Sequence, residues 1–342
     1  MNQSVNFETK PLIPALQAAK ILAWISHKSI CKSTVIANLT HALVFQGMRV
    51  LIVDTDGVPT IQMFFEQHKE ETENRIAKNK AKVNALQAKG RAVSQALLDQ
   101  IEYDEFAIEN RPVVIARSLH ELDEQFDVIK REYANFDYII VDVPAKVLDS
   151  KNNPIKEIKR LISFSNLVIT PYKGDNQNAV TAVTVSSIIE DLKYDAVSLG
   201  GKFNTKVRSL LAFEPARIKA NAKEVSANLT LTDTSTTAAR LARNAERKAL
   251  KEIDRNSQMK ADIKQFGEVF GEHQMPLNAP LVFRSVYPNQ FNKGQSIYNA
   301  TTESAKLAQA EFNLVVDAIL SAFDEEPEAV NASENQTITI TN

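Results

Sequence analysis

Glycine is scarce in this sequence: only nine of its 342 residues are glycine, and the first of them is Gly47. A loop that needs positive φ, or that approaches a ligand closely, commonly uses glycine, so any such loop before Gly47 is built from other residues. Cysteine is rarer still, with Cys31 as the single example. One cysteine excludes an internal disulfide and suits a reducing compartment such as the cytoplasm.

Long apolar runs and a strong net charge are also missing. No apolar run approaches the ~18 residues of a membrane-spanning helix, and the first residues lack the basic-then-apolar order of a signal peptide. The net charge of −2 gives no global indication of nucleic-acid or membrane binding. With 44% apolar residues, the chain can bury a large core. These features predict a soluble, cytoplasmic protein without a membrane partner.

The clearest local pattern lies near the N-terminus. Residues 21–25 are a short apolar run typical of a buried strand, residues 34–45 have helical apolar spacing, and residues 50–53 are a second apolar run. Strand, helix and strand in this order predict a βαβ unit with parallel strands. Because strands and helices continue to alternate, the sequence predicts an α/β fold with a mainly parallel, twisted sheet flanked by helices.

Further apolar patterns predict the remaining elements of this fold. Strands are expected at residues 113–115, 136–143, 164–170, 207–213 and 280–286. Helices are expected at residues 119–133, 151–160, 180–192 and 302–323. The residues of the last helix that are expected to face the core are Leu307, Phe312, Val315, Val316 and Ile319.

Residues 76–101 repeat apolar side chains at nearly heptad spacing, with Lys- and Gln-rich faces between them. The repeat consists of Ile76, Val83, Leu86, Val93, Leu97 and Ile101. It predicts an amphipathic helix that lies on the sheet or projects as one arm of a hairpin. A coiled-coil arm for a partner is the alternative, disfavoured because three heptads with Gly90 on the seam are few.

The loop after the first strand ends in Lys32, Ser33 and Thr34, directly ahead of a helix N-terminus. A phosphate-binding loop keeps its lysine, which neutralises phosphate oxygens, and its magnesium-bound hydroxyl at this place. The pattern G-x-x-x-x-G-K-[ST] is not met, because Ser26 and Cys31 stand where its two glycines belong. Alone, the motif is therefore a weak indication of a phosphate site.

Three aspartates, Asp54, Asp56 and Asp142, lie at or just past the ends of two expected strands. Because the carboxyl ends of parallel strands share one edge of a sheet, all three are expected on the same edge as the loop. Carboxylates at strand ends often only cap the following turn or helix, which is the alternative. Three of them beside the lysine and hydroxyl of the loop favour a functional site.

Four blocks of the sequence occur in a recognisable order. They are the loop with the Asp54/Asp56 pair, residues 136–145 (FDYIIVDVPA), residues 166–171 (NLVITP) and residues 284–298 near the C-terminus. In this order the blocks resemble the ParA/MinD family of deviant-Walker ATPases, whose loop reads K-G-G-V-G-K-T-T. The sequence departs from the family at three loop glycines and at His27, which replaces the signature lysine.

The resemblance implies a site for ATP and Mg²⁺. The residues expected against the nucleotide are those of the loop: His27, Lys28, Ser29, Ile30, Cys31, Lys32, Ser33 and Thr34. Ser33 and Asp142 would hold magnesium, and Asp54 would take part in the metal and loop network. Asp56 would position the attacking water, while Lys32 would stabilise charge on the transferred phosphate.

The resemblance also implies a DNA-segregation ATPase for plasmid or chromosome partition, associated with the nucleoid. Such a protein forms a homodimer around nucleotide, binds DNA non-specifically and responds to a ParB-type centromere-binding partner. The alternative, raised by the missing loop glycines, is a degenerate relative that keeps the fold, dimer or DNA binding without ATP hydrolysis. A MinD-like membrane positioner is disfavoured, because the C-terminus is acidic instead of a basic amphipathic helix.

A basic stripe is the candidate contact with DNA. Helical spacing places Arg240, Arg243, Arg247 and Lys251 along one side of a helix. Such a stripe contacts phosphate backbone without reading base sequence. A solvated helix face is an equally good interpretation, because acidic residues interleave the basic ones.

One domain accounts for most of the chain. The expected parts are a polar lead-in at residues 1–20, a single domain at 21–323 with helical insertions near 62–110 and 215–264, and an acidic, disordered tail at 324–342.

Overall fold

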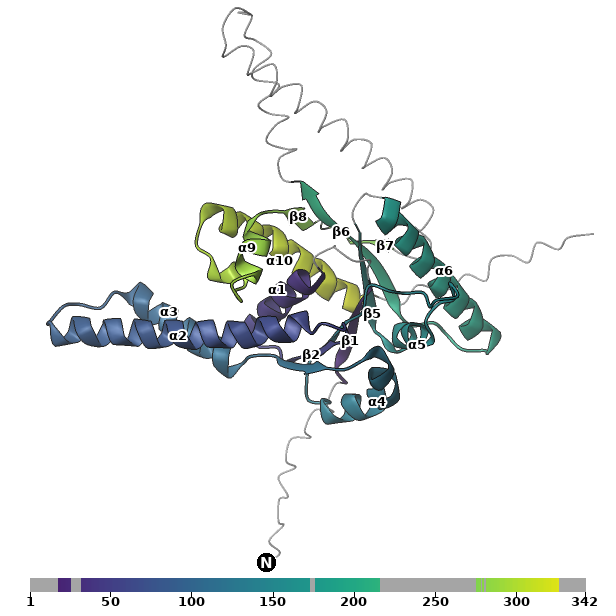
Figure 1. Ribbon diagram of the computed structural model, residues 1–342, viewed down its shortest axis with the longest axis horizontal. Helices are drawn as coiled ribbons and strands as arrows, with labels where there is room; N and C mark the ends of the chain where they lie inside the picture. The colour runs from purple at the N-terminus through teal and green to yellow at the C-terminus, as the bar shows by residue number, and fades with distance from the viewer. Residues whose placement is uncertain are drawn as a thin grey trace, which may run out of the picture.

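The computed structural model describes residues 18–25, 32–172, 176–215, 275–277, 279 and 281–325 (Figure 1). Its sheet has the strand order β3-β2-β4-β1-β5-β6-β7, and β8 also pairs with β6. All of these pairings are parallel. The predicted fold class, a mainly parallel α/β sheet flanked by helices, is therefore confirmed.

The elements have the following bounds. The strands are β1 (Lys20–Trp24), β2 (Val50–Asp54), β3 (Val113–Ala116), β4 (Tyr138–Asp142), β5 (Leu167–Tyr172), β6 (Lys206–Pro215), β7 (Met275–Pro276) and β8 (Leu281–Phe283). The helices are α1 (Lys32–Phe45), α2 (Thr60–Ala88), α3 (Gln95–Glu109), α4 (Leu119–Glu132), α5 (Lys156–Phe164), α6 (Asn176–Ser198), α9 (Val286–Phe291), the short 3₁₀ helix η1 (Ile297–Asn299) and α10 (Glu303–Asp324).

The central strands are buried on both faces, which explains why they read as continuous apolar runs. Leu22 and Trp24 of β1 pack into a core with α1, α9, α10 and the start of α2. Ile21 and Ala23, the alternate residues of the same strand, pack on the other face with α4, α5 and α6. Helices on both faces of a parallel sheet give the three-layer arrangement of a doubly wound fold.

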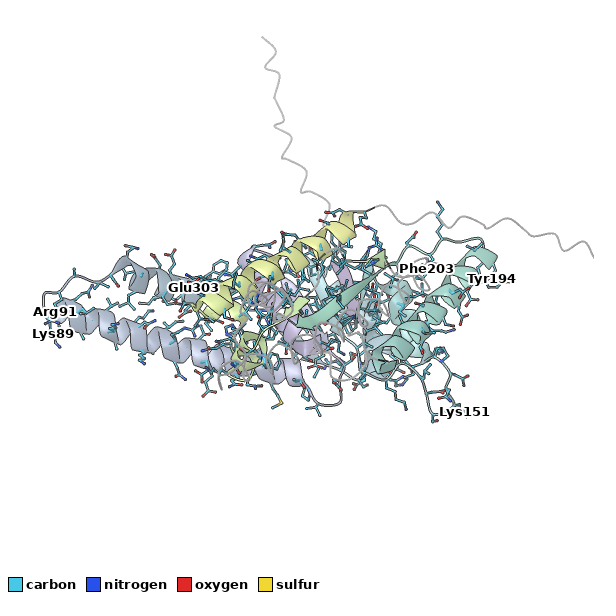
Figure 2. All side chains as sticks on the ribbon, turned by 90° about the horizontal axis from the view of Figure 1, so that it is seen from above. Lys89, Arg91, Lys151, Tyr194, Phe203 and Glu303 are labelled. Carbon is cyan, nitrogen blue, oxygen red and sulfur yellow. The ribbon has the colours of Figure 1, made fainter. Side chains whose placement is uncertain are left out.

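Helices α2 and α3 form a hairpin that projects from the sheet (Figure 1). The predicted single helix over residues 76–101 is wrong: α2 ends at Ala88, Gly90 has φ +63°, and α3 starts at Gln95. No residue from 73 to 100 is buried, so the distal half of the hairpin leaves the body of the protein. Figure 2 labels Lys89 and Arg91 at its far end.

Three smaller expectations also need correction. Helix α5 begins at Lys156 instead of residue 151 and continues through Phe164, where a strand was expected. The late strand is only β8, because Val286 already belongs to α9. Leu307 of α10 is 54% exposed, so its expected place in the core is wrong, whereas the other four residues named for this helix are buried.

Some expectations lie outside the described residues. These concern the lead-in before residue 18, the basic stripe at residues 240–251 and the tail beyond residue 325. Among the helices that the structure describes, none has the length and apolar character needed to cross a membrane.

Candidate functional site at the carboxyl edge of the sheet

Strand register brings the predicted acidic residues together. β2 and β4 are neighbours, and Asp54 pairs with Asp142 at their carboxyl ends. On its other side, β4 pairs with β1, where Trp24 is opposite Asp142. The chain leaves β1 here and re-enters described structure at Lys32, the first residue of α1. Both carboxylates and the start of α1 therefore meet at one edge of the sheet.

Lys32 and Ser33 both contact Asp142. The Lys32 Nζ atom lies 2.5 Å from Asp142 Oδ1. The Ser33 hydroxyl donates a hydrogen bond of 3.0 Å to Asp142 Oδ2. Lys32 Nζ also donates to the backbone carbonyl of Val143. The lysine and hydroxyl that end the loop are thus held against the carboxylate at the end of β4.

Asp142 lies in an environment that opposes its ionisation. Its residue is 1% exposed, and burial raises the pKa of its carboxyl group. The positive charge and hydrogen bond of Lys32 lower this pKa, the charge of Asp54 raises it, and the Ser33 hydrogen bond lowers it. The net shift of the Asp142 pKa is upward. The ionised form of this buried carboxylate therefore depends on nearby cations.

Asp54 has different neighbours. Its carboxylate accepts hydrogen bonds from the backbone N–H groups of Asp56 (3.1 Å), Ile61 (3.0 Å) and Gln62 (3.5 Å). Burial raises its pKa, and these three backbone bonds oppose the shift. Asp54 therefore caps the N-terminus of α2, the alternative considered for such residues. The expected part of Asp54 in a metal network stays a prediction.

The remaining candidate residues are Asp56 and Thr34, which the structure describes, and two groups that lie outside the described residues. Asp56 is exposed on the same edge, and its role in positioning water stays a prediction. Thr34 is buried inside α1, where its carbonyl accepts a hydrogen bond from the Asn38 side chain. His27, Lys28, Ser29, Ile30 and Cys31 lie outside the described residues, as do Arg240, Arg243, Arg247 and Lys251.

Two contributors to the site were missed in the sequence. The Thr55 hydroxyl donates a 2.7 Å hydrogen bond to the backbone carbonyl of Asp142, and the Thr55 N–H donates to the same oxygen. Its position between the two aspartates was the available indication. The carbonyl of Val143, which accepts from Lys32, has no indication in sequence because every residue type supplies one.

The oxygen atoms at this edge fit Mg²⁺. Magnesium prefers hard oxygen ligands and is commonly held by one or two protein groups together with substrate phosphates. The Ser33 hydroxyl and the Asp142 carboxylate supply such a pair, already 3.0 Å apart. In the part of the chain that the structure describes, no group of three His, Cys, Asp or Glu could hold a metal alone.

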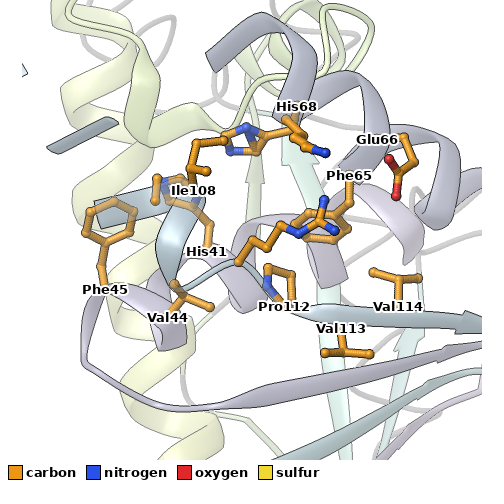
Figure 3. A pocket seen from close by; sticks show the side chains of 13 residues that line it. His41, Val44, Phe45, Phe65, Glu66, His68, Ile108, Pro112, Val113 and Val114 are labelled. Carbon is orange, nitrogen blue, oxygen red and sulfur yellow. The ribbon is translucent and has the colours of Figure 1, made fainter. Parts of the chain in front are cut away.

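A second feature lies at the root of the hairpin, on the face of α1 (Figure 3). A pocket of about 170 Å³ opens there between α1, α2, α3 and β3, lined among others by His41, Phe65 and His68. Burial is the main cause that lowers the pKa of His41 to about 3 and of His68 to about 4. Both rings are therefore neutral at pH 7, and they belong to the packing of the hairpin root.

Contacts at this root join the hairpin to α1. His41 Nε2 of α1 is 2.9 Å from the Tyr103 hydroxyl of α3. The His41 ring also stacks on His68 of α2, with centroids 5.5 Å apart. Arg75 of α2 binds the fully buried Asp104 of α3 through Nε at 2.7 Å and through a second nitrogen at 2.9 Å.

A comparison with protein families finds one match, and it covers the region that contains this site. A family described as "AAA domain" matches residues 19–172, which include β1, α1, Asp54 and Asp142. No curated protein matches.

Several solved structures are similar to this chain at low sequence identity. MinD from Aquifex aeolicus is 14% identical, with 89% of this chain and 98% of that chain covered and a TM-score of 0.47. A putative plasmid partition protein from Borrelia burgdorferi bound to AMPPNP is 13% identical, with coverage of 89% and 99% and a TM-score of 0.48. An ATP complex of McdA from Cyanothece is 13% identical, with coverage of 88% and 96% and a TM-score of 0.47. The AAA-domain match over residues 19–172 and the parallel strand order agree with the expected α/β fold, and these matches state what the chain is similar to.

Proposed function

We propose that this chain is a ParA-like DNA-segregation protein that binds ATP with Mg²⁺, forms a nucleotide-dependent homodimer and binds DNA non-specifically. In this proposal it hydrolyses ATP with a ParB-type partner and acts in the cytoplasm at the nucleoid. The observation that carries the proposal is the meeting of Lys32, Ser33 and Asp142 at the carboxyl edge of the sheet. The AAA-domain match covers this same region.

The proposed chemistry is attack of water on the γ-phosphate, which releases ADP and phosphate. Lys32 would leave Asp142 and bind phosphate oxygens, because a triphosphate carries more negative charge than one carboxylate. Ser33 and Asp142 would hold magnesium, which neutralises charge on the phosphate oxygens when bound. Asp56 would orient the water, and Asp54 would keep the start of α2 beside the site.

The second candidate is a ParA-like scaffold or DNA-binding protein that does not hydrolyse ATP. It is favoured by the close Lys32–Asp142 ion pair, since nucleotide has to compete with a carboxylate 2.5 Å from the lysine nitrogen. The absence of glycine before Gly47 points the same way. A loop without glycine holds its N–H groups around phosphate less readily.

Calorimetric titration with Mg²⁺ and ATP tests the site. We expect the wild type to bind and Lys32→Ala to lose binding, while Lys156→Ala, an exposed lysine of α5, binds as the wild type does. Ser33→Ala, which leaves the ion pair intact, should bind ATP with a weaker dependence on Mg²⁺. Binding by the wild type that survives in Lys32→Ala would rule out the proposed site.

Phosphate release then separates the two candidates. Turnover that rises with duplex DNA and is absent in Asp56→Ala would support the ATPase. Tight ATP binding without turnover under any of these conditions would favour the scaffold.

A further inference from the structure

The distal half of the α2–α3 hairpin is strongly basic. Residues 76–100 contain five basic side chains and a single acidic one, Asp99, in a protein whose net charge is −2. The root is acidic by contrast, with Glu102, Asp104, Glu105 and Glu109 on α3. Positive charge is therefore concentrated on the part of the hairpin that leaves the body of the protein, and Figure 2 shows Lys89 and Arg91 at its far end.

Most of these basic side chains are available to a partner. Lys80 is the exception, since it pairs with Glu105 at 2.5 Å. Lys78, Lys82, Lys89 and Arg91 are exposed, and none of them forms an ion pair with any residue that the structure describes. Each can therefore bind an external anion without first breaking an internal contact.

The free lysines form a straight row. At 100° per residue, Lys78, Lys82 and Lys89 fall within about 40° of one another around α2 and its C-cap. They span about 16 Å along the helix at 1.5 Å per residue, which is close to the length of five base pairs. Small or polar residues such as Ala81 and Ala85 lie between them, so a large rigid polyanion can approach the row closely.

The composition of the arm favours a duplex over other polyanions. Residues 76–100 contain no aromatic residue, whereas proteins that hold single strands stack bases on aromatic rings. Membrane-surface helices insert a wide apolar face, but here the apolar residues Val83 and Leu86 are half-buried. Rows of lysine without aromatic neighbours suit phosphate backbone contacts that carry no sequence information.

We propose that Lys78, Lys82, Lys89 and Arg91 form a docking surface for the phosphate backbone of duplex nucleic acid. The proposal deepens the proposed function, on which its choice of partner rests, by giving DNA a surface on the hairpin besides the basic stripe at residues 240–251. The surface reads backbone charge, so its binding is strongly salt-dependent and independent of base sequence.

The test compares two triple variants that remove the same charge. One is Lys78→Gln/Lys82→Gln/Lys89→Gln on the arm; the control is Lys151→Gln/Lys156→Gln/Lys202→Gln, three exposed lysines outside the hairpin. Fluorescence anisotropy with a 24-base-pair duplex of arbitrary sequence, over a series of salt concentrations, gives affinity and salt slope. We expect the slope for the arm variant to be shallower by about 3 and its affinity about tenfold weaker or more, with the control close to wild type.

The other outcomes are equally informative. Equal salt slopes and affinities for the arm variant, control and wild type would overturn the proposal. Wild-type protein that binds vesicles of phosphatidylglycerol but no duplex would also overturn it, in favour of an anionic membrane. Titration of the arm variant with Mg²⁺ and ATP distinguishes this failure from that of the proposed function, because the arm lysines lie outside the nucleotide site.

Discussion

At the scale of single residues, the site is defined by how Asp142 shares its two oxygens. Oδ1 faces Lys32 and Oδ2 accepts from Ser33, so one buried carboxylate holds both polar groups that end the loop. Without nucleotide, Lys32 is therefore the cation that compensates the buried charge of Asp142. Any phosphate that recruits Lys32 leaves this carboxylate in need of another cation, and magnesium is the ion its oxygen donors suit.

Removal of Lys32 should make folding stability depend more steeply on pH. Burial raises the folded pKa of Asp142, so the folded state binds more protons than the unfolded state, and stability falls as pH rises from about 3.9, the unfolded value. Lys32→Ala raises the folded pKa further, because the cation that opposes burial is gone. We expect a loss on the order of 3 kcal/mol at pH 7 that disappears below about pH 4. Urea unfolding at a series of pH values measures it.

The matched control is the double variant Lys32→Ala/Asp142→Asn, which has no charge left to bury. Its stability difference from Asp142→Asn should be small and independent of pH. A loss in Lys32→Ala that is the same at pH 4 and pH 7 would contradict the electrostatic explanation.

At the scale of elements, the sequence predicted the sheet better than the hairpin, for a physical reason. Buried parallel strands are short apolar runs with abrupt ends, so β1, β2 and β4 were visible within one or two residues. In the hairpin, Val83 and Leu86 of α2 and Leu97 of α3 are all half-buried. Apolar spacing consequently continues through the turn, and only Gly90 indicated a break.

Helix α10 shows a different limit of sequence patterns. Three of the seven residues on its buried face are alanines, Ala305, Ala308 and Ala322. An apolar pattern that counts large residues gives weight to Leu307, which is 54% exposed.

Prediction of the site from sequence has its own limit. The residue types indicate Lys32, Ser33 and Asp142, but the carbonyl of Val143 can be assigned only from backbone geometry.

The hairpin root should be sensitive to one glycine outside the hairpin. Gly294 has φ +62°, and a Cβ added there would lie 2.6 Å from the Gln67 Cγ and 3.0 Å from the Gln67 carbonyl carbon of α2. Gly294→Ala is therefore expected to cost about 2–3 kcal/mol, from the left-handed backbone and the clash together. The midpoint of thermal or urea unfolding gives this value.

Gly90→Ala is the control, because Gly90 has a similar φ of +63° but nothing within 4 Å of an added Cβ. It should cost only about 1 kcal/mol, the penalty of the backbone alone. Equal costs for the two variants would show that the contact between Gly294 and α2 contributes nothing to stability.

At the scale of the whole molecule, α1 and α2 connect the two proposed binding surfaces. α1 starts with Lys32 at the carboxyl edge of the sheet, and further along the same helix His41 bonds Tyr103 at the hairpin root. α2 starts at the backbone groups that Asp54 caps and continues into the basic arm. A change in position of either helix N-terminus on nucleotide binding would therefore move the arm as well.

Nucleotide and duplex should consequently affect each other's affinity. If Mg²⁺ and ATP tighten duplex binding by some factor, duplex must tighten ATP binding by the same factor, and about fivefold or more is typical of such coupling.

Tyr103→Phe removes the bond to His41 and should bring this coupling factor towards one, while each ligand alone binds nearly as in the wild type. Tyr194→Phe, at a tyrosine of α6 that is 75% exposed, should keep the full factor. ATP titrations with and without saturating duplex measure it. A full factor in Tyr103→Phe would mean that the bond between Tyr103 and His41 does not carry the coupling. The His41–His68 stack and the Asp54 cap of α2 would then be the contacts to test.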